Sequence, residues 1–308
     1  DQNKEYLLEI EYKWEGRFPA IQIGMLAPDK EDLMAQAVNL AKTSDAVIMV
    51  VGTNSDWETE GSDRSTLDLP GRQNELIQKV VKENPNTVVV VNTGSPVSMP
   101  WLNDAKAILQ SWFPGQEFGN ALFDILFGEV NPSGKLTTTF PKRLEDTPAF
   151  KHYPGENLQM DYLEEIFVGY RWYDKKEIEP LFPFGFGLSY TQFEYSDLKI
   201  IPPKKEDSAI AFSFRVTNAG KMRGKEIAQC YVSVVNSSVE RSFKELKCFS
   251  KIDLDSGKSE LLNFELNERD LSYWNEDGGG WLIEPAEYKI LVGSSSTDIL
   301  LEASVWLG

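Results

Sequence analysis

The stretch NELIQKVVKENPNTVVVVNTG, residues 74–94, decides the fold of the first half of the chain. Its first part repeats apolar residues at a helical period and stops before Pro85, which cannot continue a helix. Its second part, TVVVVNTG, is an unbroken β-branched run, typical of a strand covered on both faces in a parallel sheet. We therefore predict a helix followed by a buried parallel strand. The apolar face of the helix comprises Leu76, Ile77, Val80 and Val81.

The same helix-then-strand pattern occurs on both sides of this stretch. Upstream, a helical period over residues 33–41 leads into AVIMVVG at 46–52, and downstream AILQSWF at 107–113 gives a third strand. GQEFGNALFDILFG, residues 115–128, has the period of another helix. Strands that alternate with helices predict a mostly parallel sheet with helices on both faces, and we assign this α/β domain to residues 28–189.

From about residue 190 the helical periods disappear. Alternating strands separated by Gly, Ser, Asp and Asn turns predict an antiparallel β-sandwich over residues 190–308. The connection LFPFGFGLSY, residues 181–190, is aromatic and apolar, whereas a flexible linker is polar. We therefore predict a packed hinge that holds the two domains together. The strands that the alternation predicts most clearly are SAIAFSFRVTN, EIAQCYVSVV, KSELLNFEL and AEYKILVGSS.

The first residues of the chain have a pattern of their own. Residues 6–12, YLLEIEY, and residues 20–26, AIQIGML, alternate as the two strands of a hairpin do. Two strands cannot bury a core by themselves. We therefore expect residues 1–27 to be the end of a β domain whose other strands lie elsewhere.

Composition excludes several classes of function. A formal net charge of −17 opposes binding to nucleic acid or to an anionic membrane, and no apolar run approaches the roughly 20 residues that span a bilayer. Cys230 and Cys248 lack the spacing of a zinc site, and we interpret both as small buried hydrophobic residues. His152, the single histidine, has no nucleophile motif to serve. We expect no metal and no cofactor. Neutral molecules are the class of ligand that the negative charge does not disfavour.

An acidic loop, NSDWETEGSDR at residues 54–64, directly follows the strand at 46–52. Ligands of parallel sheets gather beyond the carboxyl ends of the strands, so the position suits a functional site. The connection from Gly52 to Pro70 is nineteen residues long, where about two to six are usual. The alternative is a capping box at residues 55–58 on a solvated surface, and composition alone leaves both interpretations open.

The loop carries a resemblance to a known family. WETEGSDRSTLDLPGRQ, residues 57–73, resembles the loop of family 3 glycoside hydrolases in which a glutamate before a glycine, followed by an Asp-Arg pair, supplies the general acid/base. The resemblance implies that Glu60 is this acid/base and that Asp63, Arg64 and Glu58 support the loop. Sugar faces pack well on aromatic rings, so Trp57 either stacks on a sugar at the leaving-group side or is a packed surface tryptophan, and both interpretations stay open.

Longer stretches match the same family in the same order, and together they reach from residue 46 to the carboxyl terminus. The resemblance implies a fold of α/β plus all-β type: an α/β sandwich domain with a mostly parallel sheet, followed by a fibronectin type III-like β-sandwich. Residues 1–27 resemble the end of a protective-antigen-type β domain inserted in some members. The matching stretches are SWFPGQEFGNALFDILFGEVNPSGKLTTTFP, FVGYRWYD, LFPFGFGLSY, VTNAGKMRGKEIAQCYV and FKELKCFSKIDL.

The resemblance also implies an activity and a partner. Members place the nucleophilic aspartate on an amino-terminal (β/α)8 barrel, which is absent from this chain, and retaining hydrolysis needs both carboxyl groups. The chain would thus be the carboxyl-terminal portion of a retaining exo-β-glycosidase of β-glucosidase type that acts on an oligosaccharide or glycoside. β-Xylosidase and α-arabinofuranosidase activities stay open, as does a non-catalytic carbohydrate-binding or scaffold subunit. Homo-oligomerisation and compartment also stay open.

Overall fold

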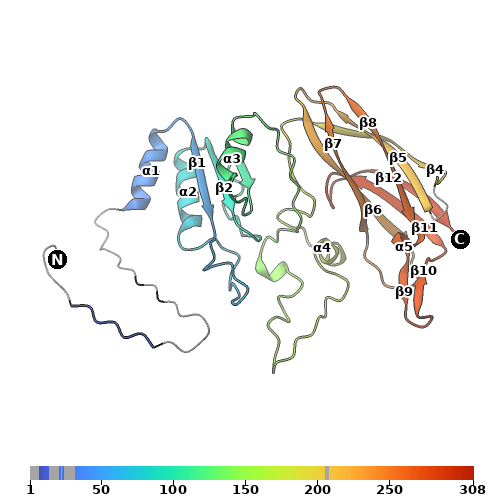
Figure 1. Cartoon of the computed structure of the whole chain (residues 1–308), viewed down its shortest axis with the longest axis horizontal. Coiled ribbons are helices and arrows are strands. Elements are labelled where there is room, and N and C mark those ends of the chain that lie inside the picture. Colours follow the sequence, from blue (N-terminus) through green and yellow to red (C-terminus); the bar gives the residue numbers. More distant parts are fainter. Residues whose placement is uncertain (1–6, 14–20, 22, 24–31, 205–207) are drawn as a thin grey trace.

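The computed structural model describes residues 7–13, 21, 23, 32–204 and 208–308. Figure 1 shows an α/β part near the amino-terminal end, a long irregular middle segment, and an all-β part that contains the carboxyl terminus. The expected succession of a helix-and-strand domain and a strand-only domain is therefore observed. None of the helices within the described ranges combines the length and the apolar character that a membrane crossing requires.

The α/β part is built on a three-stranded parallel sheet in the order β1-β2-β3. β1 (Val47–Gly52) and β2 (Thr87–Asn92) pair along their full lengths, and β3 (Ala107–Gln110) pairs with β2. The predicted parallel sheet is therefore confirmed. Because all three strands run in one direction, their carboxyl ends lie at one edge of the sheet.

Two helices supply the core on one side of this sheet. α1 (Leu33–Thr43) begins at Asp32, whose carboxylate accepts a hydrogen bond from the Ala35 N–H, and α2 (Gln73–Glu83) carries the face predicted from the sequence. α3 (Phe118–Leu126) has no fully buried residue. The fully buried members of this core are Ala41, Met49, Val51, Leu69, Ile77, Val80, Val81, Val89, Val91, Val97, Met99, Trp101 and Phe140.

The expectation that helices cover both faces of the sheet is wrong for strand β1. Ile48 and Val50, which alternate with the buried Met49 and Val51, are 51% and 52% exposed. Among the described residues, α1 and α2 pack on the face that carries Met49 and Val51. Within the part of the chain that the structure describes, the other face of β1 therefore lacks the cover that parallel strands usually have.

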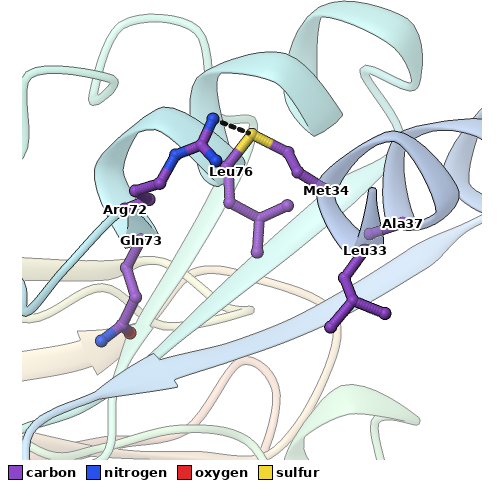
Figure 2. Close-up of a pocket in the computed structure, with 6 residues that line it drawn as sticks. All are labelled: Leu33, Met34, Ala37, Arg72, Gln73 and Leu76. Carbon is purple, nitrogen blue, oxygen red and sulfur yellow. Dashed lines mark hydrogen bonds between the residues drawn. The ribbon is translucent and has the colours of Figure 1, made fainter. Parts of the chain in front are cut away.

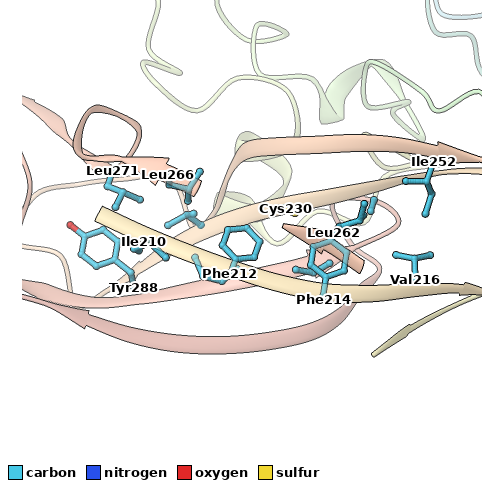
Figure 3. Packing of buried hydrophobic residues seen from close by; sticks show 14 of the residues in the cluster. Ile210, Phe212, Phe214, Val216, Cys230, Ile252, Leu262, Leu266, Leu271 and Tyr288 are labelled. Atoms are coloured by element: carbon cyan, nitrogen blue, oxygen red, sulfur yellow. The ribbon is translucent and has the colours of Figure 1, made fainter. Parts of the chain in front are cut away.

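The all-β part is a sandwich of a three-stranded sheet, β4-β5-β8, and a four-stranded sheet, β12-β11-β6-β7. Its core is apolar and aromatic, and Figure 3 shows Phe212 and Phe214 among the buried residues. Both rings stack on Phe264. A short helix and a β-hairpin lie between β8 and β11. The bounds are β4 (Phe193–Ile201), β5 (Ser208–Asn218), β6 (Gly224–Val235), β7 (Glu245–Leu254), β8 (Ser259–Asn267), α5 (Glu268–Leu271), β9 (Tyr273–Asn275), β10 (Gly280–Leu282), β11 (Ala286–Gly293) and β12 (Ile299–Leu307).

The hinge is packed against the sandwich. Gln229 on β6 is buried, and its side-chain N–H groups donate to the carbonyls of Gly185 at 3.1 Å and Ser294 at 2.6 Å. The Ser296 N–H donates to the Phe184 carbonyl at 2.9 Å. The phenol of Tyr231 donates to the side-chain Oε1 atom of Gln229 at 2.7 Å. These buried hydrogen bonds hold the connection in one conformation, whereas a flexible linker would leave it free.

Two ion pairs with little solvent exposure also join the domains. Lys135, which follows α3, lies 3.0 Å from Glu226 on β6, and their side chains are 10% and 6% exposed. Asp174, on α4 (Tyr170–Lys176), contacts Lys244 just before β7 at 2.5 Å. Burial raises the pKa of Asp174, although Lys244 opposes that shift. A short 3-10 helix, η1 (Leu144–Asp146), completes the middle segment.

The expected hairpin over residues 1–27 lies mostly outside the described residues. Residues 7–13 are described, and they form no strand and expose their side chains. A strand needs a neighbour for its backbone groups, and none of the described residues pairs with this stretch. The assignment of residues 1–27 to an inserted β domain remains a prediction.

Candidate active site

The acidic loop lies at the carboxyl edge of the parallel sheet. Gly52 ends β1, and both its N–H and its carbonyl are hydrogen-bonded by the Gln73 side chain, at 2.7 and 2.8 Å. A side chain at Gly52 would collide with the Asn92 carbonyl, because a Cβ there would lie 2.0 Å from that oxygen. The chain then turns into residues 54–64 beside the loops that follow β2 and β3. This is the edge at which ligands of parallel sheets bind.

Glu58 anchors the loop to this edge. Its Oε1 atom accepts hydrogen bonds from the Thr53 hydroxyl at 2.5 Å and from the Gly94 N–H at 3.1 Å. Arg64 lies 4.0 Å from the same oxygen, and the two side chains are only 15% and 16% exposed. A Cβ on Gly94 would approach both Glu58 Oε2 and Phe113 to 2.6 Å, so any larger residue would displace these side chains. The capping-box interpretation is wrong, because Glu58 bonds to the next loop and no helix starts here.

The second half of the loop is held by two other contacts. Arg64 donates to the Pro96 carbonyl at 3.0 Å, and Asp63 accepts a hydrogen bond from the Tyr153 phenol at 2.5 Å. Tyr153 lies in the middle segment, so this contact links two parts of the chain far apart in sequence. Thr59 and Ser62 face each other as a bridge and close a tight turn. The loop is thus fixed on both sides of that turn.

Glu60 occupies the turn between these fixed sides. It is exposed, and within the described part of the chain its carboxylate has no hydrogen bond or ion pair. The other three carboxylates of the loop differ: Glu58 and Asp63 are held as above, and Asp56 accepts from the Asn54 amide at 3.5 Å. The loop therefore presents one uncommitted carboxylate on a supported turn. Such a group can donate or accept a proton from a bound molecule.

The other residues considered from the sequence have structural surroundings. Trp57 is partly buried, and its indole N–H is covered without a hydrogen-bond partner among the described residues. Trp112 packs against the core edge-on to Phe140, with a positive φ of 56°. Glu117 is the residue before α3, where an acid stabilises a helix start, and its carboxylate accepts from the Asn120 amide at 2.7 Å.

A hollow between α1 and α2 is the other candidate site on the α/β part. Figure 2 shows the Arg72 guanidinium donating to the Met34 sulfur, at 3.4 Å, across its rim. Arg72 is already paired with Glu75 at 2.7 Å. The hollow contains no acid and base that face each other, and we assign it no catalytic role. Its lining comprises Leu33, Met34, Ala37, Arg72, Gln73 and Leu76.

Among residues 7–13, 21, 23, 32–204 and 208–308, no three His, Cys, Asp or Glu side chains converge as metal ligands do.

Four partners of the loop were not predicted from the sequence: Thr53, Gly94, Pro96 and Tyr153. A glycine directly after a strand end is a signal for close backbone approach, and Gly94 carries it. Tyr153 carries no such signal.

Comparison with known proteins adds the family. A profile of the glycosyl hydrolase family 3 C-terminal domain matches residues 4–190, more than half of the chain, and a profile of the fibronectin type III-like domain matches residues 226–296. The chain belongs to glycosyl hydrolase family 3. The expected fold class, an α/β sandwich domain followed by a fibronectin type III-like β-sandwich, is thereby confirmed.

Individual relatives are longer than this chain. The chain is 47% identical over 276 residues to thermostable beta-glucosidase B of Acetivibrio thermocellus, covering 89% of itself and 37% of that protein. It is 46% identical over 290 residues to a beta-glucosidase of Kluyveromyces marxianus, covering 92% and 34%. A crystal structure of the Kluyveromyces marxianus beta-glucosidase in complex with glucose matches with a TM-score of 0.86 at 44% identity, covering 92% of this chain and 34% of that chain. The family 3 chain thus spans about a third of these relatives' length.

The contact between Tyr153 and Asp63 gives a first prediction. Tyr153→Phe removes the only donor of this hydrogen bond, and we expect backbone amides 59–64 to exchange hydrogen roughly two- to tenfold faster. Hydrogen exchange read by mass spectrometry measures this directly. Tyr162→Phe, at an exposed tyrosine in the same segment, is the matched control. Unchanged exchange in Tyr153→Phe would mean that the contact does not hold the loop.

The same contact should depend on pH in a defined direction. The hydrogen bond to Asp63 is the main cause that raises the pKa of the Tyr153 phenol above its ordinary value of about 10. The contact is therefore present at neutral pH and is lost as the pH rises through the raised pKa, where the phenol loses its donor proton. Exchange in wild type should approach that of Tyr153→Phe only at strongly alkaline pH.

Proposed function

We propose that this chain is the carboxyl-terminal portion of a retaining exo-β-glycosidase, a β-glucosidase, in which Glu60 is the general acid/base. The observation that carries the proposal is the position of Glu60, the one carboxylate of residues 54–64 without a partner among the described residues, at the carboxyl edge of the sheet. The names of the relatives support the substrate class, terminal non-reducing β-D-glucosyl residues.

In the proposed mechanism the two catalytic carboxyl groups come from different portions of the polypeptide. A barrel-borne aspartate attacks the anomeric carbon, while Glu60 donates its proton to the departing glycosidic oxygen. Glu60 then removes a proton from the incoming water, which displaces the aspartate and releases the sugar with its configuration retained. A retaining pair lies about 5 to 5.5 Å apart, so the barrel portion must place its aspartate beside the turn of residues 59–62.

The neighbours of Glu60 have supporting roles in this proposal. Glu58 and Arg64 fix the beginning and end of the loop, and Asp63 restrains the turn through Tyr153. The indole nitrogen of Trp57 is covered, so only its partly exposed ring can contact a sugar. We therefore propose that Trp57 packs its ring on the leaving group. This arrangement leaves Glu60 free to change its protonation state during turnover.

The second prediction tests whether catalysis needs both portions of the polypeptide. The purified 308-residue chain should not hydrolyse aryl β-glucosides, and co-expression with an amino-terminal barrel portion should restore turnover, because one carboxylate of a pair cannot run double displacement. Release of nitrophenol measures both. Turnover by the purified chain alone would contradict the proposal. A complete protein that binds oligosaccharides without cleaving any glycoside would favour the scaffold alternative.

Sugar preference is a separate outcome of the same assay. If a β-xyloside or an α-arabinofuranoside were cleaved faster than the β-glucoside, the proposed mechanism would stand and the proposed substrate would change. In this proposal the barrel portion sets the sugar preference, because it holds the pocket for the non-reducing sugar. Parallel kcat/KM values on the three aryl glycosides therefore complete the test.

A further inference from the structure

The two cysteines of the chain face each other across neighbouring strands. Cys230 on β6 and Cys248 on β7 are direct partners in the antiparallel register. They are the only cysteines among 308 residues, and both are free. Figure 3 places Cys230 among the core residues of the sandwich. The next register pair is Tyr231 with Leu246, so the pair adjoins a β-bulge at Lys247.

The geometry of such a pair suits a disulfide. Directly opposed residues of antiparallel strands have Cα atoms about 4.5 or 5.5 Å apart, and disulfides form over about 4.4 to 6.8 Å. Both side chains point into the sandwich, since Cys230 belongs to its buried core and Cys248 packs against that core. A hydrogen-bonding contact between the thiols is the first cause that raises the pKa of Cys230, and burial is the second. The two side chains therefore enter the same core from directly opposed positions of neighbouring strands.

We propose that Cys230 and Cys248 form a reversible disulfide, introduced by exchange with a small-molecule disulfide such as oxidised glutathione. Cys248 reacts first, because it is partly exposed, whereas Cys230 is 1% exposed and its thiol resists ionisation. The Cys248 thiolate attacks one glutathione sulfur and releases one glutathione. Cys230 then loses its proton, attacks the Cys248 sulfur and releases the second. Two protein thiols and one glutathione disulfide thus give one protein disulfide and two glutathione thiols.

The disulfide would restrain β7, a strand of the sandwich that contacts the middle segment of the chain. β7 is an edge strand of its sheet, paired to β6 alone. Its first residues reach the middle segment: the Leu246 N–H donates to the Tyr170 phenol oxygen at 2.8 Å, and Glu245 lies 3.8 Å from Arg171. A covalent link at position 248 would therefore hold both the sheet edge and this contact. In the reduced protein the same edge is held by noncovalent contacts alone.

Intact mass after treatment of the folded 308-residue chain with oxidised glutathione tests the proposal. Wild type should lose the mass of two hydrogen atoms, should yield a linked peptide containing both cysteines, and should recover its mass with dithiothreitol. Cys230→Ala should instead gain one glutathione, and Cys248→Ala should gain none. Hydrogen exchange of the β7 amides should slow roughly tenfold or more on oxidation.

Two results would overturn the proposal. One is wild type that keeps two free thiols, or carries bound glutathione without losing hydrogen, under native conditions. The other is a disulfide that forms only in urea, since the native register would then not be what brings the sulfurs together. The wild-type mass and the linked peptide decide the question even where a single-cysteine variant fails to fold.

Discussion

In the complete enzyme, meaning this chain together with its barrel portion, Glu60→Ala is expected to lower kcat/KM for unactivated disaccharides by roughly 10²- to 10⁴-fold. A sugar hydroxylate leaves poorly without a proton, so loss of the acid slows the first step. A nitrophenolate leaves without that help, so the first step should be spared for nitrophenyl glucosides. Their turnover should then be limited by the second step and begin with a burst of nitrophenol.

Matched variants in the same loop separate this effect from loss of structure. Asp56→Ala removes an exposed loop carboxylate and should leave both substrates nearly unaffected. Glu58→Gln keeps an acceptor for Thr53 and Gly94 but removes the charge beside Arg64, so it should act on stability and slow both substrates alike. Equal losses on disaccharide and nitrophenyl glucoside in Glu60→Ala would argue against acid catalysis. Thermal melting of each variant shows whether the fold is intact.

Lys135→Ala is expected to destabilise the chain by about 3 to 5 kcal/mol, the largest stability effect that we predict. Removal of the ammonium group leaves Glu226, 6% exposed, without its opposite charge. Lys135 also donates to the Gly187 carbonyl at 3.0 Å, and Tyr195 donates to Glu226 at 3.3 Å. The change therefore disrupts a buried network at the domain junction. Urea unfolding of the purified chain measures the difference in free energy.

Lys225→Ala is the matched control, because Lys225 lies next to Glu226 on strand β6. Lys225 is 53% exposed and lies 3.9 Å from Asp253, so its loss should cost no more than about 1 kcal/mol. Replacing both charges together, in Lys135→Met with Glu226→Leu, should cost much less than Lys135→Ala, because no unpaired charge remains buried. If Lys135→Ala matched Lys225→Ala, the pair would not hold the domains together.

The sequence predicted the α/β part well because its signals are local. The helical face on α2 and the unbroken valines of β2 describe burial in a short window, and both are observed. Strand β5 also matches the predicted stretch. Strands β4 and β12 were not among the predicted strands, and their side chains alternate only between exposed and half-buried positions, which gives weak contrast. The open face of β1 was missed because its composition is that of a covered strand.

The candidate site was predictable in position and not in its contacts. The position of residues 54–64 after β1 follows from topology. The bonds that support the loop join Glu58 to Gly94 over 36 residues and Asp63 to Tyr153 over 90 residues. No local pattern encodes such pairs, because they depend on where two other segments pass the sheet edge. The contacts that distinguish Glu58 from Glu60, two acids of one loop, therefore became visible only in the structure.

The product formed in azide tests the central proposal most directly. Azide attacks the glycosyl-enzyme without needing a base, so Glu60→Ala of the complete enzyme should regain turnover of a nitrophenyl β-glucoside in azide and release β-glucosyl azide, identified by NMR. Glu58→Ala should show neither rescue nor this product. A β-glucosyl azide from Glu58→Ala and none from Glu60→Ala would place the acid/base at residue 58, and its absence from both would contradict a catalytic role for this loop.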